Sequence, residues 1–413
     1  MSKVVVVGGG VIGLFSAWFL AKKGAEVTVI DKGDFSDGCS YGNAGLIVPS
    51  HVVPLASPGM LKKGVKNLFN SSSAVGFRFA PEKDLIRWYL KFVSVANERH
   101  VRNSIHILKE LSLFSKDLFS EIKTSGELDF PLWKNGLLML YQSEGTGADL
   151  QEEAKIARDA GLKVDELSLA DILQLEPDAK PNVAGGFLYH SDNHLNPNVL
   201  MNVLKHTLQE KGIVFKPNCE VKKIQIESNK AVRIETENED FDFDELVIAA
   251  GMWSRELLNQ LHTKIDVQPG KGYSFVVNPS SPIHYPALLS DVNLAVTPLG
   301  NGAVRFGGGM EVGHKDYKIN KRRVEKIIKS VGEFYPSEKQ IEIKEKQIWQ
   351  GHRPCSFDGL PYIGRVPKFQ NIYVGTGHSM MGVTLGPVTG LLLSELISGE
   401  RTSLDLKAFR IGR

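Results

Sequence analysis

The chain has 413 residues, 42% of them hydrophobic and 23% charged, with a formal net charge of +2. This length favours two domains over one small core, and the near-neutral charge argues against nucleic acid as a main partner. The widely spaced Cys39, Cys219 and Cys355 fit no metal site or disulfide framework. With no signal peptide and no bilayer-spanning run expected, the sequence predicts a cytoplasmic protein.

The N-terminal stretch predicts a dinucleotide-binding unit. Its parts come in the order strand 4–7, glycine pattern 8–13, helix 14–23 and strand 26–30. Gly8 permits a tight turn, Gly10 lets the backbone approach a pyrophosphate, and Gly13 lets the helix pack on the strand. The helix N-terminus offers free N–H groups to phosphates. Asp31 is placed to bind a ribose hydroxyl, which favours FAD or NAD over NADP.

A small, polar, Gly-rich loop at 39–45 follows, and its backbone could line the phosphates or a flavin ring; an ordinary loop is the alternative. Residues 61–79 mix lysines with apolar and aromatic side chains. Such a mixture can rest on a membrane surface, but it is more often a solvated excursion whose apolar residues dock on the body. Residues 82–123 predict two long helices whose apolar stripes face the core.

The middle of the chain predicts strands and helices of both domains. Asn196 and Pro197 fit the N-cap and first position of a helix ending near Lys211. The strand at 246–250, with Ala250 and Gly251 at its end, returns to the dinucleotide domain. Strands at 267–277, 295–298 and 303–309, with a helix at 321–333, predict an antiparallel sheet over a ligand.

The last informative stretch runs from Gly351 to Ser398. It contains Gly351-His352-Arg353-Pro354, an apolar strand at 372–374, a glycine-rich loop at 375–384 and a helix. The N-terminus of that helix could direct its dipole at a second negative centre, such as the polar edge of a reduced flavin.

With these motifs in place, the chain resembles the D-amino-acid oxidase and glycine oxidase family of FAD enzymes, and within it the D-amino-acid dehydrogenase branch. The resemblance implies an α/β fold in which a Rossmann-like FAD-binding domain joins a second domain built on an antiparallel sheet plus helices. The implied division is 1–62, 186–256 and 350–413 for FAD, and 63–185 and 257–349 for the substrate.

The resemblance also implies the residues that hold FAD without a covalent bond. They are Gly8, Gly10, Val11, Ile12, Gly13, Asp31, Lys32, Ser40, Asn43, Ala44, Gly45, Val221, Ala250, Gly251, Gly377, His378, Met380, Gly382, Val383 and Thr384. Cys355 would be the attachment point if the flavin were covalent, but its offset from Asp358 differs from that of covalent members. No metal is expected.

For the substrate, Arg353 matches the family arginine that holds a carboxylate, and Tyr273 is a candidate pocket residue. His51 and His352 depart from the usual apolar surroundings, so a ring substrate such as D-proline or hydroxy-D-proline becomes an option. Ser379 stands where the family often has glycine, and its side chain could alter backbone geometry or access to the flavin.

The resemblance implies an oxidoreductase acting on CH–NH₂ or CH–NH, in which a D-amino acid or cyclic imino acid gives a hydride to flavin N5. Electrons would pass to a quinone or other acceptor, such as a redox protein, with peripheral contact on the inner face of the cell membrane as an option. Alternatives are a glycine- or sarcosine-type oxidase using O₂, an NAD-dependent dehydrogenase and a flavin-dependent RNA-modification module. No protein base is required if the amine arrives neutral.

Overall fold

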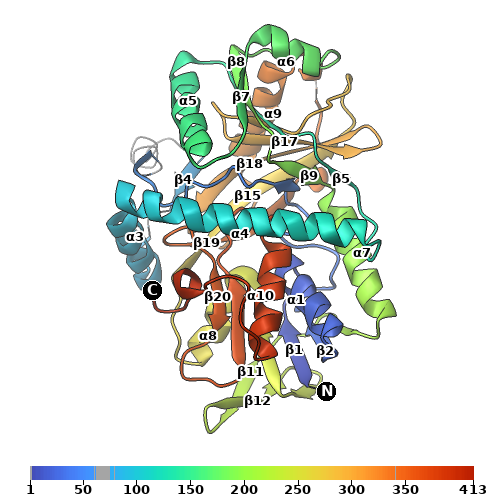
Figure 1. Cartoon of the computed structure of the whole chain (residues 1–413), viewed down its shortest axis with the longest axis vertical. Coiled ribbons are helices and arrows are strands. Elements are labelled where there is room, and N and C mark those ends of the chain that lie inside the picture. Colours follow the sequence, from blue (N-terminus) through green and yellow to red (C-terminus); the bar gives the residue numbers. More distant parts are fainter. Residues whose placement is uncertain (1, 60, 62–74, 79, 340) are drawn as a thin grey trace.

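A computed structural model describes residues 2–59, 61, 75–78, 80–339 and 341–413. The molecule is elongated, with one sheet at each end and the long helix α4 (Glu98–Thr124) crossing between them (Figure 1). The cofactor-type motifs of the sequence lie at one end and the predicted second sheet at the other. This is the mixed α/β architecture that the sequence predicted.

The first sheet has six strands among the described residues, in the order β10-β2-β1-β14-β21-β20. All neighbours pair in parallel except β20 with β21. The bounds are β1 Lys3–Val7, β2 Glu26–Ile30, β10 Val214–Lys216, β14 Glu245–Ile248, β20 Tyr362–Arg365 and β21 Ile372–Thr376. Val4 to Val7 are all buried, as expected of a central strand covered on both faces.

Helices α1 (Val11–Lys22) and α10 (Gly386–Ile397) cover one face of this sheet (Figure 1). Every residue of α1 from Val11 to Leu20 is buried because α4, α10 and α7 (Pro197–Glu210) pack around it. Asn196 caps α7 by accepting from the N–H groups of Asn198 and Val199, as predicted. The opposite face carries α8 (Ser254–Gln260) and a small sheet of β11 (Lys223–Glu227), β12 (Lys230–Glu235) and β13 (Asp240–Asp242).

The second sheet has nine strands among the described residues, in the order β19-β15-β18-β17-β16-β6-β8-β7, with β4 beside β18. The bounds are β4 Val75–Phe77, β6 Leu137–Tyr141, β7 Val164–Leu167, β8 Gly185–Tyr189, β15 Val267–Val277, β16 Ala287–Leu289, β17 Leu294–Gly300, β18 Ala303–Val312 and β19 Trp349–Ser356. It is mostly antiparallel, but β16 pairs in parallel with β6, and β4 with β18. The sheet is therefore mixed rather than purely antiparallel.

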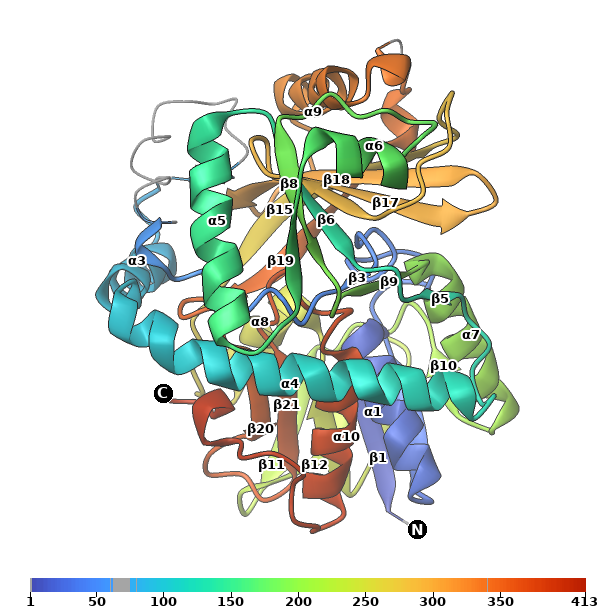
Figure 2. The ribbon, with the colours of Figure 1, turned by 45° about the horizontal axis from the view of Figure 1, so that its top comes forward.

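Helix α9 (Lys321–Phe334) packs on one face of this sheet, where Phe275, Phe306 and Phe334 form part of a core. Helix α5 (Glu144–Asp159) lies beside β7 and β8, and α6 (Leu169–Leu175) lies near them (Figure 2). A three-stranded sheet of β3 (Leu46–Ile47), β9 (Asn193–Leu195) and β5 (Leu132–Trp133) lies between the two large sheets.

Two sequence expectations differ from the structure. Residues 351–354 belong to a full edge strand, β19, rather than to an isolated motif. The strand at 185–189 pairs with β6 in the nine-stranded sheet, whereas the predicted division gave residues 186–189 to the FAD part.

The basic and apolar stretch predicted for membrane contact is only partly visible. Leu61, Phe77 and Arg78 are described, while residues 62–74 and Phe79 lie outside the described residues. The helix that follows, α3 (Lys83–Val95), buries Leu85 and Trp88 against the body. Among the described helices, none combines the length and apolar character that crossing a membrane requires.

Candidate cofactor and substrate site

A single continuous cavity of about 1180 Å³ runs between the two sheets in the described part of the chain. One end is lined by the carboxyl ends of β1 and β2 and by Val221, and the other by β19 and the loop between β21 and α10. A cleft at the carboxyl ends of parallel strands is where open α/β sheets bind ligands.

Glycines at the start of the cavity leave no room for side chains. A Cβ on Gly8 would lie 2.4 Å from the carbonyl oxygen of Ala249, and Gly8 has φ of 114°. A Cβ on Gly13 would lie 1.8 Å from the carbonyl oxygen of Gly8. Both positions therefore need glycine for packing, which leaves the adjacent backbone free to line the cavity.

The N-terminus of α1 opens into the same end. Gly10 occupies the N-cap position without a side-chain cap, and the Val11 N–H donates to the Ser40 hydroxyl over 2.9 Å. The Asp31 carboxylate accepts from the N–H groups of Gly9 (2.6 Å) and Gly33 (2.7 Å). Helix N–H groups and a fixed acid at this spacing fit the pyrophosphate and ribose of a dinucleotide.

Further residues of the predicted cofactor set line the cavity as well. They are Gly8, Gly10, Val11, Ile12, Asp31, Lys32, Ser40, Asn43, Ala44, Val221, Ala250, Gly251, His378, Met380, Gly382 and Val383. Four residues of the predicted set do not belong to the described lining, namely Gly13, Gly45, Gly377 and Thr384. The Lys32 ammonium lies 3.5 Å from the centre of the Trp253 ring, and burial lowers the pKa of Lys32.

The loop after β21 forms the far wall and is tied down at two points. His378 is buried, its Nε2 lies 2.9 Å from the Thr389 hydroxyl, and burial lowers its pKa to about 3. The Thr384 hydroxyl donates to the Leu46 carbonyl over 2.9 Å. The imidazole of His378 therefore stays neutral and fixes the loop to α10, rather than offering a charge to a ligand.

Arg353 extends from β19 into the cavity with only backbone partners. Its Nη1 donates to the carbonyl of Gly309 over 2.9 Å, and no carboxylate pairs with it among the described residues. Glycine at 272 makes room for it, because a Cβ there would lie 1.9 Å from Nη1. Burial lowers the pKa of the guanidinium. A cation held this way is suited to a carboxylate ligand.

Tyr273 and His352 both line the cavity, but their side chains leave β15 and β19 on the opposite face from Arg353. Side chains alternate along a strand, so His352 and its neighbour Arg353 point to opposite faces. In the register of β15 with β19, Tyr273 lies on the same face as His352, which we call the outer face. The Tyr273 hydroxyl donates to Glu311 Oε1 (2.6 Å) and accepts from the Asn320 N–H (3.2 Å). With both functions of the hydroxyl in use, Tyr273 contributes shape to the cavity edge.

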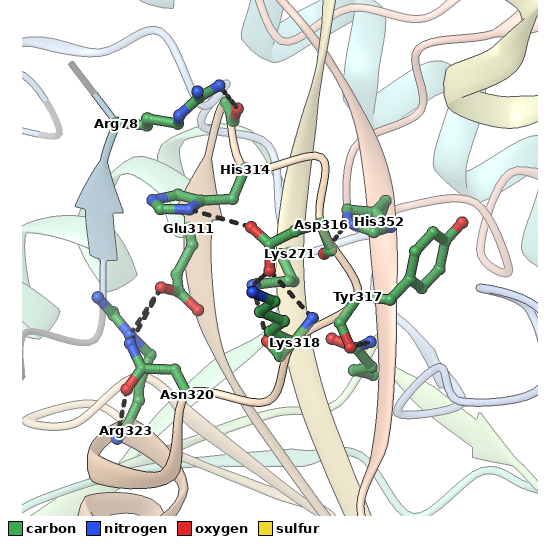
Figure 3. A network of polar contacts seen from close by, with 12 residues as sticks. Arg78, Lys271, Glu311, His314, Asp316, Tyr317, Lys318, Asn320, Arg323 and His352 are labelled. Carbon is green, nitrogen blue, oxygen red and sulfur yellow. Dashed lines mark hydrogen bonds and ion pairs between the residues drawn. The ribbon is translucent and has the colours of Figure 1, made fainter. Parts of the chain in front are cut away.

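Figure 3 shows the network that occupies this outer face. Lys271 Nζ lies 2.9 Å from Asp316 Oδ1, and His352 Nε2 lies 3.1 Å from the Asp316 carbonyl oxygen. The Tyr317 ring contacts His352 edge-on at 4.8 Å. Arg323 Nε lies 3.5 Å from Glu311 Oε2. His352 is therefore held within a structural network under the segment between β18 and α9.

His51 does line the cavity, and burial lowers its pKa. Its segment is held by Asp192, which is fully buried and accepts from the N–H of Ser50 (3.1 Å) and from the Ser50 hydroxyl. Burial raises the pKa of Asp192 to about 7, against the opposing effect of the Ser50 hydrogen bonds. Sequence reasoning missed this role, since no local pattern links Asp192 to a loop 142 residues away.

The two cysteines near Arg353 differ in position. Cys39 lines the cavity, and its thiol lies 2.9 Å from the His352 carbonyl. Cys355 is fully buried, does not belong to the described cavity lining, and points at β15, where a Cβ on Gly270 would lie 2.7 Å from its sulfur. Burial raises the pKa of both thiols to about 11.

A Rossmann-type sheet, a capless helix N-terminus and a long cleft that ends at an arginine define an oxidoreductase that uses a dinucleotide cofactor. The chain belongs to the DAO family of FAD dependent oxidoreductases, whose sequence model matches residues 3–396. The cofactor is therefore FAD, and the residues that line the cavity fit it.

Relatives and solved structures extend this likeness over the whole chain. It is 29% identical over 419 residues to a D-amino acid dehydrogenase of Vibrio atlanticus (strain LGP32), covering 100% of this chain and 99% of the relative. It is 28% identical over 397 residues to a D-amino acid dehydrogenase of Helicobacter pylori, covering 95% and 94%. The sequence resemblance to the oxidase family is thus confirmed.

Two solved structures share the fold. The glycine oxidase of Geobacillus kaustophilus superposes with a TM-score of 0.78 at 24% identity, covering 100% of this chain and 99% of that one. The L-proline dehydrogenase of P. horikoshii gives 0.75 at 19% identity, covering 99% and 96%. The predicted fold class, a Rossmann-like FAD domain with a second sheet domain, is confirmed.

Proposed function

We propose that this enzyme oxidises a D-amino acid or a cyclic imino acid and passes the electrons to a quinone or a redox protein. The observation that carries the proposal is Arg353, a guanidinium that enters the FAD cavity and has no acidic partner among the described residues. The names of the Vibrio and Helicobacter relatives support the D-amino-acid class.

Arg353 would bind the substrate carboxylate through two parallel N–H···O bonds. Its hydrogen bond to the Gly309 carbonyl and the close approach of Gly272 fix the guanidinium plane, so the α-carbon of the substrate is oriented without a large entropic cost at binding. When bound, FAD takes up the two electrons that the substrate loses.

Two histidines of the cavity lining favour a neutral amine as the reacting form. His51 and His378 both have a pKa lowered by burial, so neither brings a second positive charge toward the amine. Neutral His51 is within the lining and could accept a proton, but a substrate that arrives as free amine needs no protein base. The cyclic option, D-proline or hydroxy-D-proline, rests on the confined lining at His51.

The electron acceptor is proposed from the surface of α3. Ile86, Leu90 and Val93 lie on one helical face and are 46%, 68% and 54% exposed. The preceding sequence adds Lys62, Lys63 and Lys66. An exposed apolar row on a helix suits contact with the surface of a bilayer, where quinones dissolve. We place the peripheral contact there, on the inner face of the cell membrane.

A steady-state screen tests the function. Purified enzyme is offered D- and L-amino acids, glycine, sarcosine and both prolines, each with a dye acceptor and separately with O₂. We expect D-enantiomers or a cyclic D-imino acid to reduce the dye, with little hydrogen peroxide. Rapid peroxide formation with glycine or sarcosine would instead support the oxidase alternative, and activity limited to L-substrates would reject the proposal.

A further inference from the structure

Trp349 enters the cavity from the same face of β19 as Arg353. Trp349, Gly351 and Arg353 occupy alternate positions of this strand, so all three point to one face of it. Trp349 and Arg353 both belong to the cavity lining, and Trp349 is half-buried. A large aromatic ring therefore lies in the cavity on the side of the arginine, although binding a carboxylate does not require one.

Two glycines hold the indole of Trp349 in place. A Cβ on Gly42 would lie 2.0 Å from Trp349 Cδ2. This atom joins the two rings of the indole and can be approached only from a ring face, so Gly42 lies against one face. A Cβ on Gly351 would lie 2.2 Å from Cη2, at the far end of the ring. Contacts at a face and at one end fix the indole, which then offers the cavity a rigid apolar surface.

The ends of the two side chains meet over one pair of glycines. Gly272 of β15 and Gly351 of β19 lie directly opposite each other. Arg353 Nη1 lies 1.9 Å from the Cβ position of Gly272, as Trp349 Cη2 does at 2.2 Å from that of Gly351. Opposite Cβ positions are about 4.5–5.5 Å apart, so at most about 10 Å separates the guanidinium from the ring. An amino acid held by its carboxylate spans this gap with its α-carbon and the first atoms attached to it.

We propose that Trp349 determines substrate specificity by packing its indole against an apolar substituent on the α-carbon. The inference rests on the proposed function and gives its substrate class, which is apolar D-amino acids and cyclic imino acids rather than glycine, whose α-carbon has no substituent. Methylene groups that leave water for the surface of a ring gain free energy. Because the ring is already fixed, little of that gain is spent on ordering it.

The test uses achiral acids that bind without reacting. Acetate, propionate, butyrate and cyclopentanecarboxylate are titrated into the FAD-loaded enzyme, and the visible flavin spectrum reports each Kd. Each buried methylene should tighten binding about fourfold, so butyrate should bind about 15-fold more tightly than acetate. Cyclopentanecarboxylate should bind at least as tightly as butyrate. In Trp349→Ala the gain from acetate to butyrate should fall to about twofold or less, whereas Trp349→Phe should keep most of it.

Two glycine variants separate the aromatic wall from the carboxylate anchor. Gly351→Ala places a methyl group 2.2 Å from the indole and should reduce the gain per methylene. Gly272→Ala places one 1.9 Å from the guanidinium and should weaken all four acids by the same factor. Trp133→Ala is the matched control, because this ring stacks on His194 and does not belong to the described cavity lining. Its Kd series should equal that of the wild type.

The ratio of two Kd values on one protein sample is independent of its FAD content and melting temperature. A Trp349 with a purely structural role would therefore keep the wild-type ratio in Trp349→Ala, and this result would overturn the proposal. Equal binding of acetate and butyrate by the wild type, or an equal loss in Trp133→Ala, would overturn it too. Should Trp349→Ala fail to fold, Gly351→Ala decides. If the acids behave as expected while D-substrates are rejected, the proposed function fails and the role of Trp349 stands.

Discussion

The two faces of the β15–β19 strand pair carry alternating residues of the same strands and differ in function. On the face that carries Arg353, Gly272 and Gly351 leave space, and Arg353 enters the cavity with only backbone partners. On the outer face, Lys271 and His352 join a paired polar network. Neighbouring residues of one motif can thus have separate functions, one in binding and one in stability, because a strand turns them to opposite sides.

The strongest test of this comparison is Arg353→Ala. Removing one member of a desolvated charge pair costs roughly 2–5 kcal/mol, so kcat/KM should fall about 30-fold to several thousandfold, at about 1.4 kcal/mol per factor of ten. Arg353→Lys should recover only part, because an ammonium lacks the planar fork. Steady-state kinetics with a dye acceptor measures both.

The Arg353 variants should remain yellow, since the FAD contacts lie elsewhere in the cavity. For an amine substrate without a carboxylate, kcat/KM should fall far less in these variants. Normal kcat/KM in Arg353→Ala, or a loss traced wholly to missing FAD, would assign the arginine a structural role.

Gly272→Ala tests the space on the same face without touching the charge. The new methyl group would meet the guanidinium at 1.9 Å, so Arg353 must shift. A displacement near 1 Å costs about 100-fold in rate, and we expect kcat/KM to fall by about 10- to 100-fold.

Gly145→Ala, in α5, is the matched control because nothing lies within 4 Å of its added methyl group. Its kinetics should match the wild type. Equal kinetics in Gly272→Ala would show that the close approach of Gly272 does not set the guanidinium position.

On the outer face, Tyr273→Phe should act on stability. The change leaves the buried Glu311 carboxylate without its 2.6 Å hydrogen bond, which costs about 1–3 kcal/mol of unfolding free energy. Denaturant titration should show this, while kcat/KM changes by less than about threefold. A large kinetic defect in a stable Tyr273→Phe protein would give the Tyr273 hydroxyl a direct role in substrate binding and contradict the comparison.

Features that depend on local sequence could be predicted, and features that depend on contacts between distant segments could not. The stretch from Gly8 to Asp31 was predictable because its strand, turn and helix are local and their glycines are sterically required. The face on which Tyr273 and His352 lie could not be predicted, because it depends on the register of β15 with β19. The contact of Asp192 with Ser50 joins segments 142 residues apart, which no local spacing in the sequence records.

The smallest expected effect concerns the Lys271–Asp316 pair. Partial burial would raise the pKa of Asp316, but hydrogen bonds from Lys271 and the Lys318 N–H outweigh it and lower the pKa to about 2. A lowered pKa stabilises the fold above the unfolded value, about 3.9, and this stability is lost as pH falls through about 2. Because Asp316 is 45% exposed, the pair contributes less than about 1 kcal/mol.

Asp316→Asn should therefore lower unfolding free energy slightly at pH 6 and not at pH 2, as measured by chemical denaturation at both values. Dye-coupled kcat/KM at pH 6 should match the wild type. A kinetic change larger than the stability change would mean that the outer network reaches the cavity.

The arrangement of the six-stranded sheet has a consequence for how the protein forms during synthesis. Strand β1 pairs with β14, which pairs with β21, and most of the printed sequence lies between the first and last of these strands. A nascent chain therefore carries β1 with an open apolar edge until β14 has been made, and then β14 with an open edge until β21 has been made. Such long-range pairing is slow and exposed to aggregation, so chaperone supply and late capture of FAD should govern the yield of active enzyme in a cell.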